Sequence, residues 1–409
     1  MTNRFHGAVS RTFVSLRNRN YRLFFVGQLI SNTGNWLTMV ALTLLVLHRT
    51  HSGLAVGLLT ACQFGPILLF GAWAGAIADR SDKRRLLFVT QGLEMAQSCV
   101  LAVLAFQSHS PLVLLYATAF AGGCMLSLDN PLRRSFVTEM VQGDDVPNAV
   151  MLYSTIVNIS RVFGPTLAGL LVATVGYGWC FSLDAASYIA VLVALGMMRT
   201  TELRRRPPTP RGRGQVREGL RYVRRIPELW VSFVILAVVG TFGYNFSVVF
   251  PLFVEQSLHG SDVTFTLIYA TFSVGALVGA LVAANRGHVT VDLIVGGCAA
   301  FGGAMVLLAL VPSAAFAFPV VLLVGATSIT YMTATTAIVQ VRADPQMHGR
   351  VLALQTVLLV GTTPIGGPLL GAISDRWGAR TPVAVGAVAT LGAAAWGAFA
   401  ARRYSLHRR

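Results

Sequence analysis

The sequence of 409 residues has little charge, little cysteine and almost no lysine. Charged residues make up 12% of the chain, hydrophobic residues make up 54%, and the mean hydropathy is +0.64. These values exclude an ordinary soluble domain, in which about a quarter of the residues are charged. The only lysine is Lys83, which does not stand in a G-x-x-x-x-G-K-S/T motif. The chain therefore carries no P-loop, which excludes an ATP-driven pump built from this chain alone.

Motifs for catalysis, metal binding and disulfides are also missing. The five cysteines form no C-x-x-C pair and have no neighbouring histidine, so neither disulfides nor a metal site are predicted. The sequence contains no H-E-x-x-H or G-x-S-x-G motif, and the segments between its apolar runs are too short to build a catalytic domain. We therefore expect a protein that is not an enzyme and that needs no cofactor or metal.

What the sequence does contain is a series of long apolar runs. About 20 apolar residues are needed to cross the hydrocarbon of a bilayer. Residues 1–20 are polar and basic and the first run is full length, so we expect no cleavable signal peptide. The fold class predicted is an all-α membrane protein, with spans at residues 22–47, 53–78, 86–107, 111–128, 149–175, 178–198, 230–255, 263–284, 290–311, 314–338, 351–374 and 382–401.

The spans divide into two halves that share features at an offset near 204 residues. Gly71 and Gly75 match Gly275 and Gly279, and the pair Gly164 and Pro165 matches Gly367 and Pro368. Two six-span halves with a polar linker at the midpoint are typical of secondary transporters. The predicted organisation is an N-terminal segment at 1–21, a first half at 22–198, an Arg/Pro-rich linker at 199–229, a second half at 230–401 and a tail at 402–409.

Basic residues are distributed unevenly between the two sides of the membrane. The termini and the even-numbered loops hold 28 of the 32 basic residues, whereas the odd-numbered loops hold only Arg49, Arg376 and Arg380. Since cytoplasmic loops hold an excess of Lys and Arg, both termini are predicted to be cytoplasmic. The net charge of +16 is spread over turns beside the membrane, so we expect contact with anionic lipid at the linker and no binding of nucleic acid.

A charged turn follows the second span. The run from Gly75 to Arg85 contains Asp79 and a basic cluster, and it joins two helices directly. A carboxylate beside a helix N-terminus contributes roughly 0.3–1 kcal/mol when exposed and up to ~2 kcal/mol when partly buried. The turn therefore predicts a reversible latch, and its candidate residues are Gly75, Asp79, Arg80, Lys83 and Arg84.

This turn, the stretch at residues 129–134 and the stretch Arg161 to Pro165 resemble the major facilitator superfamily. The resemblance covers the whole chain and is best to the bacterial drug-efflux branch that includes macrolide and enterobactin exporters. It implies two pseudo-symmetric six-helix halves, and it implies that Asp79, Arg80 and Arg84 hold the start of the eleventh helix. Asp82 stands where the family has a glycine, and Ala283 and Ala284 stand where Asp79 and Arg80 map in the second half, so we expect asymmetric gating.

The Gly-Pro pairs of spans five and eleven resemble the antiporter motif of drug exporters. Proline removes a backbone hydrogen bond and bends a helix, and glycine lets another helix approach. The resemblance implies that Gly164, Pro165, Gly367 and Pro368 help to seal one side of the transporter, which favours export over import. Ordinary helix packing is the alternative explanation.

Polar residues in the first, seventh and tenth spans are candidates for a substrate cavity. Gln28, Asn32 and Asn35 lie on one helical face, where contact with lipid would cost several kcal/mol for each group. The resemblance implies that spans one, four, seven and ten line the cavity. The other candidates are Tyr244, Asn245, Thr327 and Tyr331, and hydrogen bonding between helices is the competing role for all seven.

Charged residues in the interior of predicted spans are Glu94, Arg161 and Asp184, while Asp292 stands at the start of the ninth span. Intramembrane ionisable residues are costly and are functional by default. Glu94 is the candidate for proton coupling, while a structural ion pair of Glu94 or Asp184 with Arg161 is the alternative.

The sequence thus predicts a monomeric carrier in the plasma membrane that exports an amphipathic small molecule by alternating access, in exchange for protons. A dedicated exporter of a siderophore or lipid-like metabolite, an importer and a membrane sensor without transport remain as alternatives.

Overall fold

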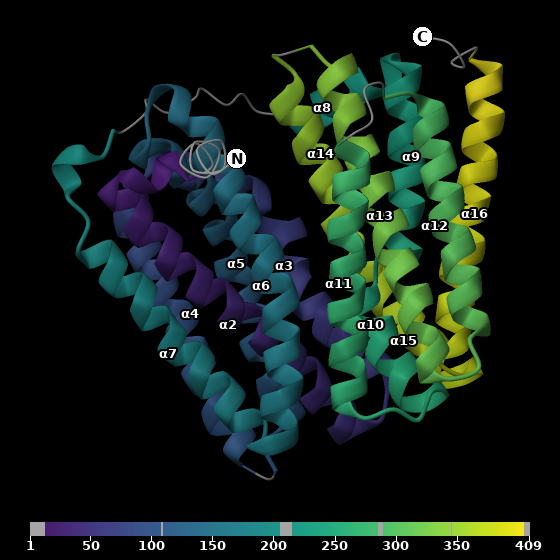
Figure 1. Ribbon diagram of the computed structural model, residues 1–409, viewed down its shortest axis with the longest axis horizontal. Coiled ribbons are helices and arrows are strands. Elements are labelled where there is room, and N and C mark those ends of the chain that lie inside the picture. The colour runs from purple at the N-terminus through teal and green to yellow at the C-terminus, as the bar shows by residue number, and fades with distance from the viewer. Residues whose placement is uncertain (1–12, 108, 205–214, 285–288, 345, 405–409) are drawn as a thin grey trace, which may run out of the picture. The chain divides into compact units, whose positions relative to one another are not determined.

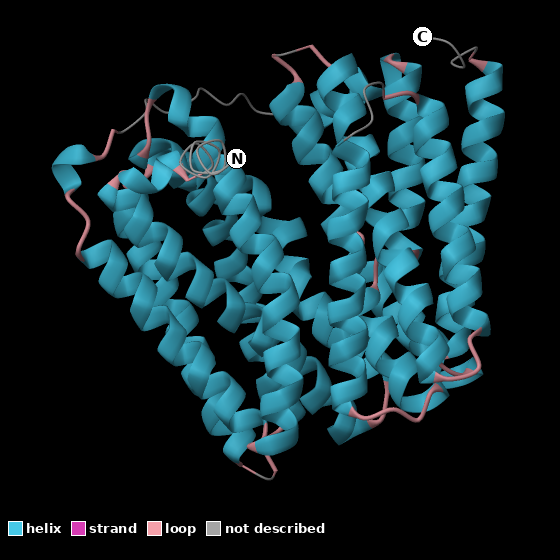
Figure 2. Ribbon diagram, in the orientation of Figure 1, coloured by secondary structure: helices cyan, strands magenta, loops and turns pink. Residues whose placement is uncertain are grey.

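The computed structural model describes residues 13–107, 109–204, 215–284, 289–344 and 346–404, without the side chains of residues 72, 76, 79, 215–217 and 284. Within these ranges every regular element is a helix, and Figure 2 shows short loops between the helices. Twelve helical segments are long and apolar enough to cross a membrane. The predicted all-α membrane fold is confirmed. Helices form here because the hydrocarbon offers no water to the backbone, so each N–H and C=O must be paired within its own segment.

The chain folds into two compact units. Unit 1 comprises Met1–Leu42 and Leu69–Pro210, and unit 2 comprises Thr43–Leu68 and Arg211–Arg409. Two long helices, α2 (Arg19–Thr50) and α3 (Gly53–Arg80), therefore each contribute residues to both units. The hairpin formed by Thr43–Leu68 packs with the second half of the chain rather than with the rest of the first half.

Unit 1 also contains four further long helices, labelled in Figure 1. They are α4 (Lys83–Phe106), α5 (Leu112–Met140), α6 (Val146–Thr174) and α7 (Tyr177–Gly196), with short 3₁₀ turns η1 (Val14–Arg17), η2 (Gly143–Asp145) and η3 (Thr200–Glu202). Their core is aromatic at one end, where the ring of Phe24 lies 5.8 Å from Phe136 and 6.1 Å from Tyr153. The buried Tyr21 hydroxyl donates to the carbonyl of Ala149 at 2.7 Å, which ties α2 to α6.

Unit 2 contains the remaining helices. They are α8 (Gln215–Arg225), α9 (Pro227–Phe242), α10 (Phe246–Leu252), η4 (Phe253–Ser257), α11 (Asp262–Ala284), α12 (Val291–Leu310), α13 (Ala314–Arg342), α14 (His348–Val360), α15 (Thr363–Trp377) and α16 (Arg380–Arg403). The pairs α11–α13 and α12–α16 pack most extensively. An aromatic cluster lies inside this unit, with Phe246 4.6 Å from Phe272 and 4.9 Å from Phe250 between ring centroids.

Two of the predicted spans are broken helices. The seventh is interrupted between α9 and α10, and the eleventh is interrupted between α14 and α15. The breaks pack on each other, because a Cβ on Gly240 or Gly366 would come closer than 3.0 Å to a backbone carbonyl oxygen of the facing segment. Irregular backbone at membrane depth is tolerated where protein buries it, and it is a common feature of transporter binding sites.

The fourth span is longer than the sequence suggested. We placed its end at residue 128, but α5 continues to Met140, so Asp129 and Arg133 lie on a buried helical turn. The prediction of a loop there was wrong, because the two opposite charges are four residues apart and pair with each other along the helix. The linker also contains structure in its described part, since α8 is a helix whose Tyr222 hydroxyl donates to Asp344 at 2.9 Å.

Candidate functional site

A network of buried charges lies inside unit 1, between α4 and α5. Arg133 forms ion pairs with Asp129 on its own helix and with Glu94 on α4, where Nη2 lies 3.4 Å from Oε2. All three residues are at most 4% exposed. Removing charges from water costs several kcal/mol for each ion, so such a group persists only where its partners compensate it. Two acids thus share one arginine inside the helical bundle.

Neutral side chains complete this network. The Gln91 amide donates to Glu94 and to Asp129, each at 2.9 Å, and the Thr90 hydroxyl donates to Asp129 at 3.2 Å. Asp129 thus receives the closer ion pair and two hydrogen bonds, whereas Glu94 receives a longer ion pair and one hydrogen bond. Asp129 therefore has more and closer polar partners than Glu94.

Asp184 of α7 occupies a separate polar position in the same unit. Its carboxylate accepts hydrogen bonds at 2.7 Å from Thr38 on α2 and from Ser98 on α4. A Cβ on Gly34 would come closer than 3.0 Å to Asp184, so the glycine makes room for the carboxylate beside α2. Asp184 therefore joins three helices through hydroxyl groups.

One amide of the first span contacts the charge network, and the other two contact neutral groups beside it. Arg133 donates to the Asn32 side-chain oxygen at 3.3 Å, and the Tyr188 hydroxyl donates to Asn35 at 2.8 Å. Asn32 donates in turn to the carbonyl of Gln28 at 2.9 Å. Among the described residues, the buried Nε2 of Gln28 has no hydrogen-bond partner. An unsatisfied buried donor costs about 1–3 kcal/mol, so this amide favours a polar ligand or a water beside it.

The arginine that pairs with Glu94 is not the one named in the alternative drawn from the sequence. Arg133 pairs with Glu94, although the predicted fourth span ended at residue 128 and placed Arg133 in a loop. Arg161 lies on α6, and its guanidinium is 5.4 Å from the centre of the Trp36 ring on α2. The Asp129 and Arg133 spacing of four residues was the signal that identifies a helical ion pair.

The charged turn after the second span is built from helix ends. Asp82 caps α4 by accepting from the Arg85 backbone N–H at 3.2 Å, and its φ of −65° needs no glycine. Lys83 forms a buried ion pair with Glu139, while Arg84 donates to the Leu195 carbonyl at 2.8 Å at the end of α7. Cations at helix C-termini are favourable because of the helix dipole. Arg80 is exposed, and the side chain of Asp79 lies outside the described residues.

The candidate residues of unit 2 lie at and near the break in the seventh span. Tyr244 donates to the Ser328 carbonyl at 2.5 Å, and Asn245 donates to Thr241 at 2.7 Å. The described atoms offer no hydrogen-bond partner to the buried Oδ1 of Asn245 or to the buried Tyr331 hydroxyl. Thr327 differs, since it donates to its own helix at 2.8 Å and lines a groove of about 270 Å³ with small residues of α11 and α12.

The two Gly-Pro pairs are close-packing positions. A Cβ on Gly164 would come closer than 3.0 Å to Trp36 and to the Thr33 carbonyl on α2. In unit 2, a Cβ on Gly57 of α3 would come equally close to Gly367 and Pro368 of α15. Each pair thus lies where a second helix approaches backbone to backbone.

Together, twelve spans, a buried charge network and broken helices define a membrane transporter of the major facilitator type. The family model described as "Transmembrane secretion effector" matches residues 10–405, and the chain belongs to that family within the major facilitator superfamily. The predicted family is confirmed.

Several transporters of bacteria are similar to this chain. It is 26% identical to the staphyloferrin A transporter of Staphylococcus aureus over 64% of this chain, and that match spans 66% of the relative, just under two thirds of its length. It is 22% identical to macrolide efflux protein A of Streptococcus pyogenes, over 88% of this chain and 91% of the relative. It is 26% identical to the enterobactin exporter EntS of Salmonella typhimurium, over 91% of this chain and 89% of the relative.

Solved structures share the fold at low sequence identity. A bacterial homologue of the human lysosomal transporter Spinster, in an inward-facing conformation, aligns with a TM-score of 0.69 at 16% identity, covering 94% of this chain and 96% of that one. A POT family transporter bound to a conjugated peptide aligns with a TM-score of 0.78 at 10% identity, with the same coverage. These likenesses show that the chain has the major facilitator fold.

Proposed function

We propose that the protein is a secondary active exporter of amphipathic small molecules that exchanges its substrate for protons. The observation that carries this proposal is the pair of acids, Glu94 and Asp129, that share Arg133 inside a membrane-spanning bundle. Two carboxylates beside one arginine cannot both remain fully compensated, so one of them binds a proton readily. Glu94 has the fewer and longer contacts, and we assign the transported proton to it.

Export is supported by the relatives, whose names describe efflux of macrolides and export of enterobactin. On the proposed orientation, both termini are cytoplasmic and the transporter acts as a monomer in the plasma membrane. A dedicated exporter of a siderophore is the second candidate, because two of the relatives handle staphyloferrin A and enterobactin.

The substrate is proposed to bind polar atoms that the protein leaves unpaired. In unit 2, taken by itself, these atoms are the side-chain oxygens of Asn245 and Tyr331. Rings of the aromatic cluster lie near them, with Tyr244 5.5 Å from Phe301. A few unpaired polar atoms beside aromatic rings suit an amphipathic molecule and do not select one shape.

Cells that express the protein are expected to accumulate less of a fluorescent lipophilic dye, and a protonophore should abolish that difference. Glu94→Gln should remove the protonophore-sensitive efflux, because an amide cannot carry a proton between the two sides. The matched control is Glu202→Gln, which neutralises an acid that is exposed and paired with Arg199 at 3.1 Å. Normal accumulation with a correctly inserted protein would point to a narrow physiological solute or to import.

Asp79→Asn is expected to leave expression intact and to slow transport. The carboxylate is proposed to hold a helix N-terminus, and its loss weakens that contact by roughly 0.3–1 kcal/mol, or up to ~2 kcal/mol if it is partly buried. The measurement is initial efflux rate at matched amounts of membrane-inserted protein. An unchanged rate would remove Asp79 from the gating residues.

A further inference from the structure

The outer ends of helices α3 and α15 are joined by a carboxylate in unit 2. Asp375, in the last turn of α15, accepts a hydrogen bond from the Gly53 backbone N–H at 2.5 Å and from the Leu54 N–H at 2.9 Å. It also accepts from the Ser52 hydroxyl at 2.7 Å. The first N–H groups of a helix have no partner within the helix. Asp375 therefore caps α3 from another helix, with its charge at the positive end of the α3 dipole.

The same two helices touch through their backbones beside this cap. A Cβ on Gly53 or Gly57 would come closer than 3.0 Å to the carbonyl oxygen of Gly371 or Gly367, respectively. The contacts run in opposite order along the two helices, which shows that they pack antiparallel. Glycines spaced four apart on both helices allow this approach.

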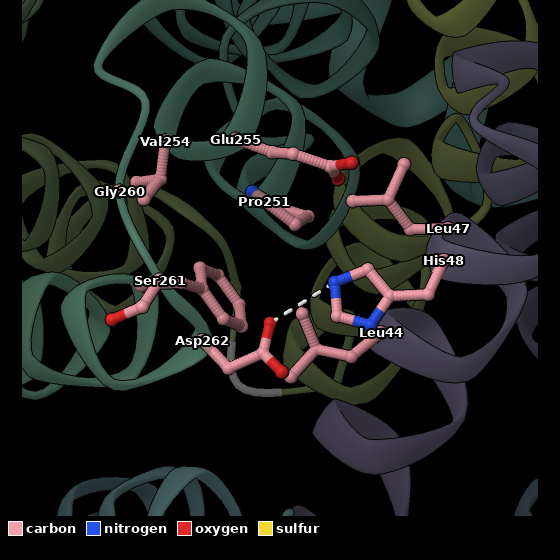
Figure 3. A pocket seen from close by; sticks show the side chains of 10 residues that line it. Leu44, Leu47, His48, Pro251, Val254, Glu255, Gly260, Ser261 and Asp262 are labelled. Carbon is pink, nitrogen blue, oxygen red and sulfur yellow. Dashed lines mark ion pairs between the residues drawn. The ribbon is translucent and has the colours of Figure 1, made fainter. Parts of the chain in front are cut away.

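Two histidines add to the contact between the hairpin Thr43–Leu68 and the second half. His48 lies 3.2 Å from Asp262 at the start of α11, and His51 lies 3.3 Å from Glu255 of η4. Figure 3 shows His48 and Asp262 facing each other in a pocket of about 240 Å³. Three acids of the second half thus hold this hairpin at one end of unit 2.

The sequence around Asp375 repeats the end of α3. Residues 371–376 read G-A-I-S-D-R and residues 75–80 read G-A-I-A-D-R, and each stretch ends a membrane-spanning helix. This repeat does not follow the offset near 204 that relates the two halves, because its second copy lies in span eleven, whereas span eight has Ala283 in place of the acid. The acid of this second copy is Asp375, and its partner is the start of α3.

We infer that Asp375 is a gating latch at the outer face, formed with Ser52, Gly53 and Leu54, and that it acts in opposition to Asp79. The inference rests on the proposed function, in which the hairpin side is extracellular. When the α3–α15 latch is formed, the hairpin Thr43–Leu68 is held on the second half and the outer side is closed. The substrate leaves outward only after the latch opens. The backbone of Asp79 lies at the other end of the same α3 helix, and the latch proposed for Asp79 and the latch of Asp375 hold alternate states.

The latch is tested by the reactivity of a buried position beneath it. Leu252 is 1% exposed, and a Cβ on Gly53 would come within 2.9 Å of its side chain. Leu252→Cys is introduced into a variant without the five native cysteines, and a membrane-impermeant maleimide is added to intact cells. Asp375→Asn should raise the labelling rate about fivefold, as expected when a charged contact at a helix terminus is lost. Arg376→Gln is the matched control, because it changes the neighbouring charge and leaves the carboxylate in place.

Ser52→Ala removes one of the hydrogen bonds to Asp375, so it should raise the labelling rate at position 252 by a smaller factor. This variant provides the test if the Asp375→Asn protein does not reach the membrane. Equal rates for these variants and the parent would overturn the latch, as would an equal increase with Arg376→Gln. Labelling does not require transport. A raised labelling rate in a protein that exports no dye would therefore support the latch and count against the proposed substrate class, whereas dye export with unchanged labelling would do the reverse.

Discussion

Replacing Arg133 by methionine is expected to lower the yield of folded protein severalfold and to abolish transport. Arg133 is 3% exposed and pairs with Glu94 and Asp129, which are also buried. Removing one partner from a buried ion pair costs about 3–5 kcal/mol, because the remaining charges stay out of water without compensation. The stability of a whole domain is only about 5–15 kcal/mol. The measurement is monodisperse yield in detergent together with the thermal unfolding midpoint.

Arg134→Met is the control for this experiment. Arg134 is the next residue on α5 but is exposed, so its loss removes the same charge without leaving a buried acid unpaired. We expect it to fold like the parent. Similar losses for both substitutions would mean that net charge near the membrane, and not the buried network, decides the yield.

A neutral version of the network separates folding from coupling. In the triple variant Arg133→Met, Glu94→Gln, Asp129→Asn, no charge remains in the group, and replacing a buried ion pair by neutral groups of similar volume is often tolerated. We expect this variant to recover the folded yield that Arg133→Met loses. It should not recover protonophore-sensitive efflux, because the proposed proton carrier is absent. Recovery of efflux would contradict the assignment of the proton to Glu94.

The spans were predictable from the sequence because each is an apolar run of the length that a bilayer requires. Their ends were less predictable. A hydropathy window adds the cost of burying Asp129 to the cost of burying Arg133. In the folded helix the two side chains form an ion pair, which offsets part of both costs. The i,i+4 spacing of opposite charges carries that information, and hydropathy does not.

The breaks in spans seven and eleven illustrate a second limit. Gly243 and Asn245 in span seven and Gly361 in span eleven are compatible with a continuous membrane helix, since glycine is frequent there. The breaks are stabilised by contacts between the two segments, such as Gly366 against Thr241. Such contacts join residues more than 100 positions apart, so local sequence cannot specify them.

The types of residue in the candidate site were predictable from the sequence, but the ion pairs and hydrogen bonds between them were not. Gln28, Asn32 and Asn35 share a helical face as expected. Asn32 contacts the charge network through Arg133, whereas Asn35 accepts a hydrogen bond from Tyr188. Arg161 was considered as an alternative partner of Glu94 because Arg133 was placed in a loop beyond the fourth span, whereas the structure pairs Glu94 with Arg133. Asp375 was missed for another reason, since its partner is a helix N-terminus, which sequence alone marks only by position.

Gly279→Leu is expected to prevent folding of the second half. A Cβ at Gly275, Gly279 or Gly325 would lie closer than 3.0 Å to a backbone carbonyl oxygen of the facing helix, in the contact between α11 and α13. Backbone cannot rotate away as a flexible side chain can, so the two helices must separate along their whole contact. Overpacking of a core costs about 1–3 kcal/mol when side chains can adjust, and more is expected here.

A graded pair of substitutions tests whether this contact is set by backbone approach. Gly279→Ala adds only a Cβ, which would lie closer than 3.0 Å to the Ala326 carbonyl oxygen. This substitution alone should therefore lower the unfolding midpoint, and Gly279→Leu should lower it further. Gly303→Leu on α12 is the matched control, because nothing lies within 4 Å of its Cβ, and it should leave the midpoint unchanged. Equal behaviour of Gly279→Leu and Gly303→Leu would mean that α11 and α13 tolerate a wider separation. The glycines shared by spans two and eight would then reflect helix composition and not close packing of α11 against α13.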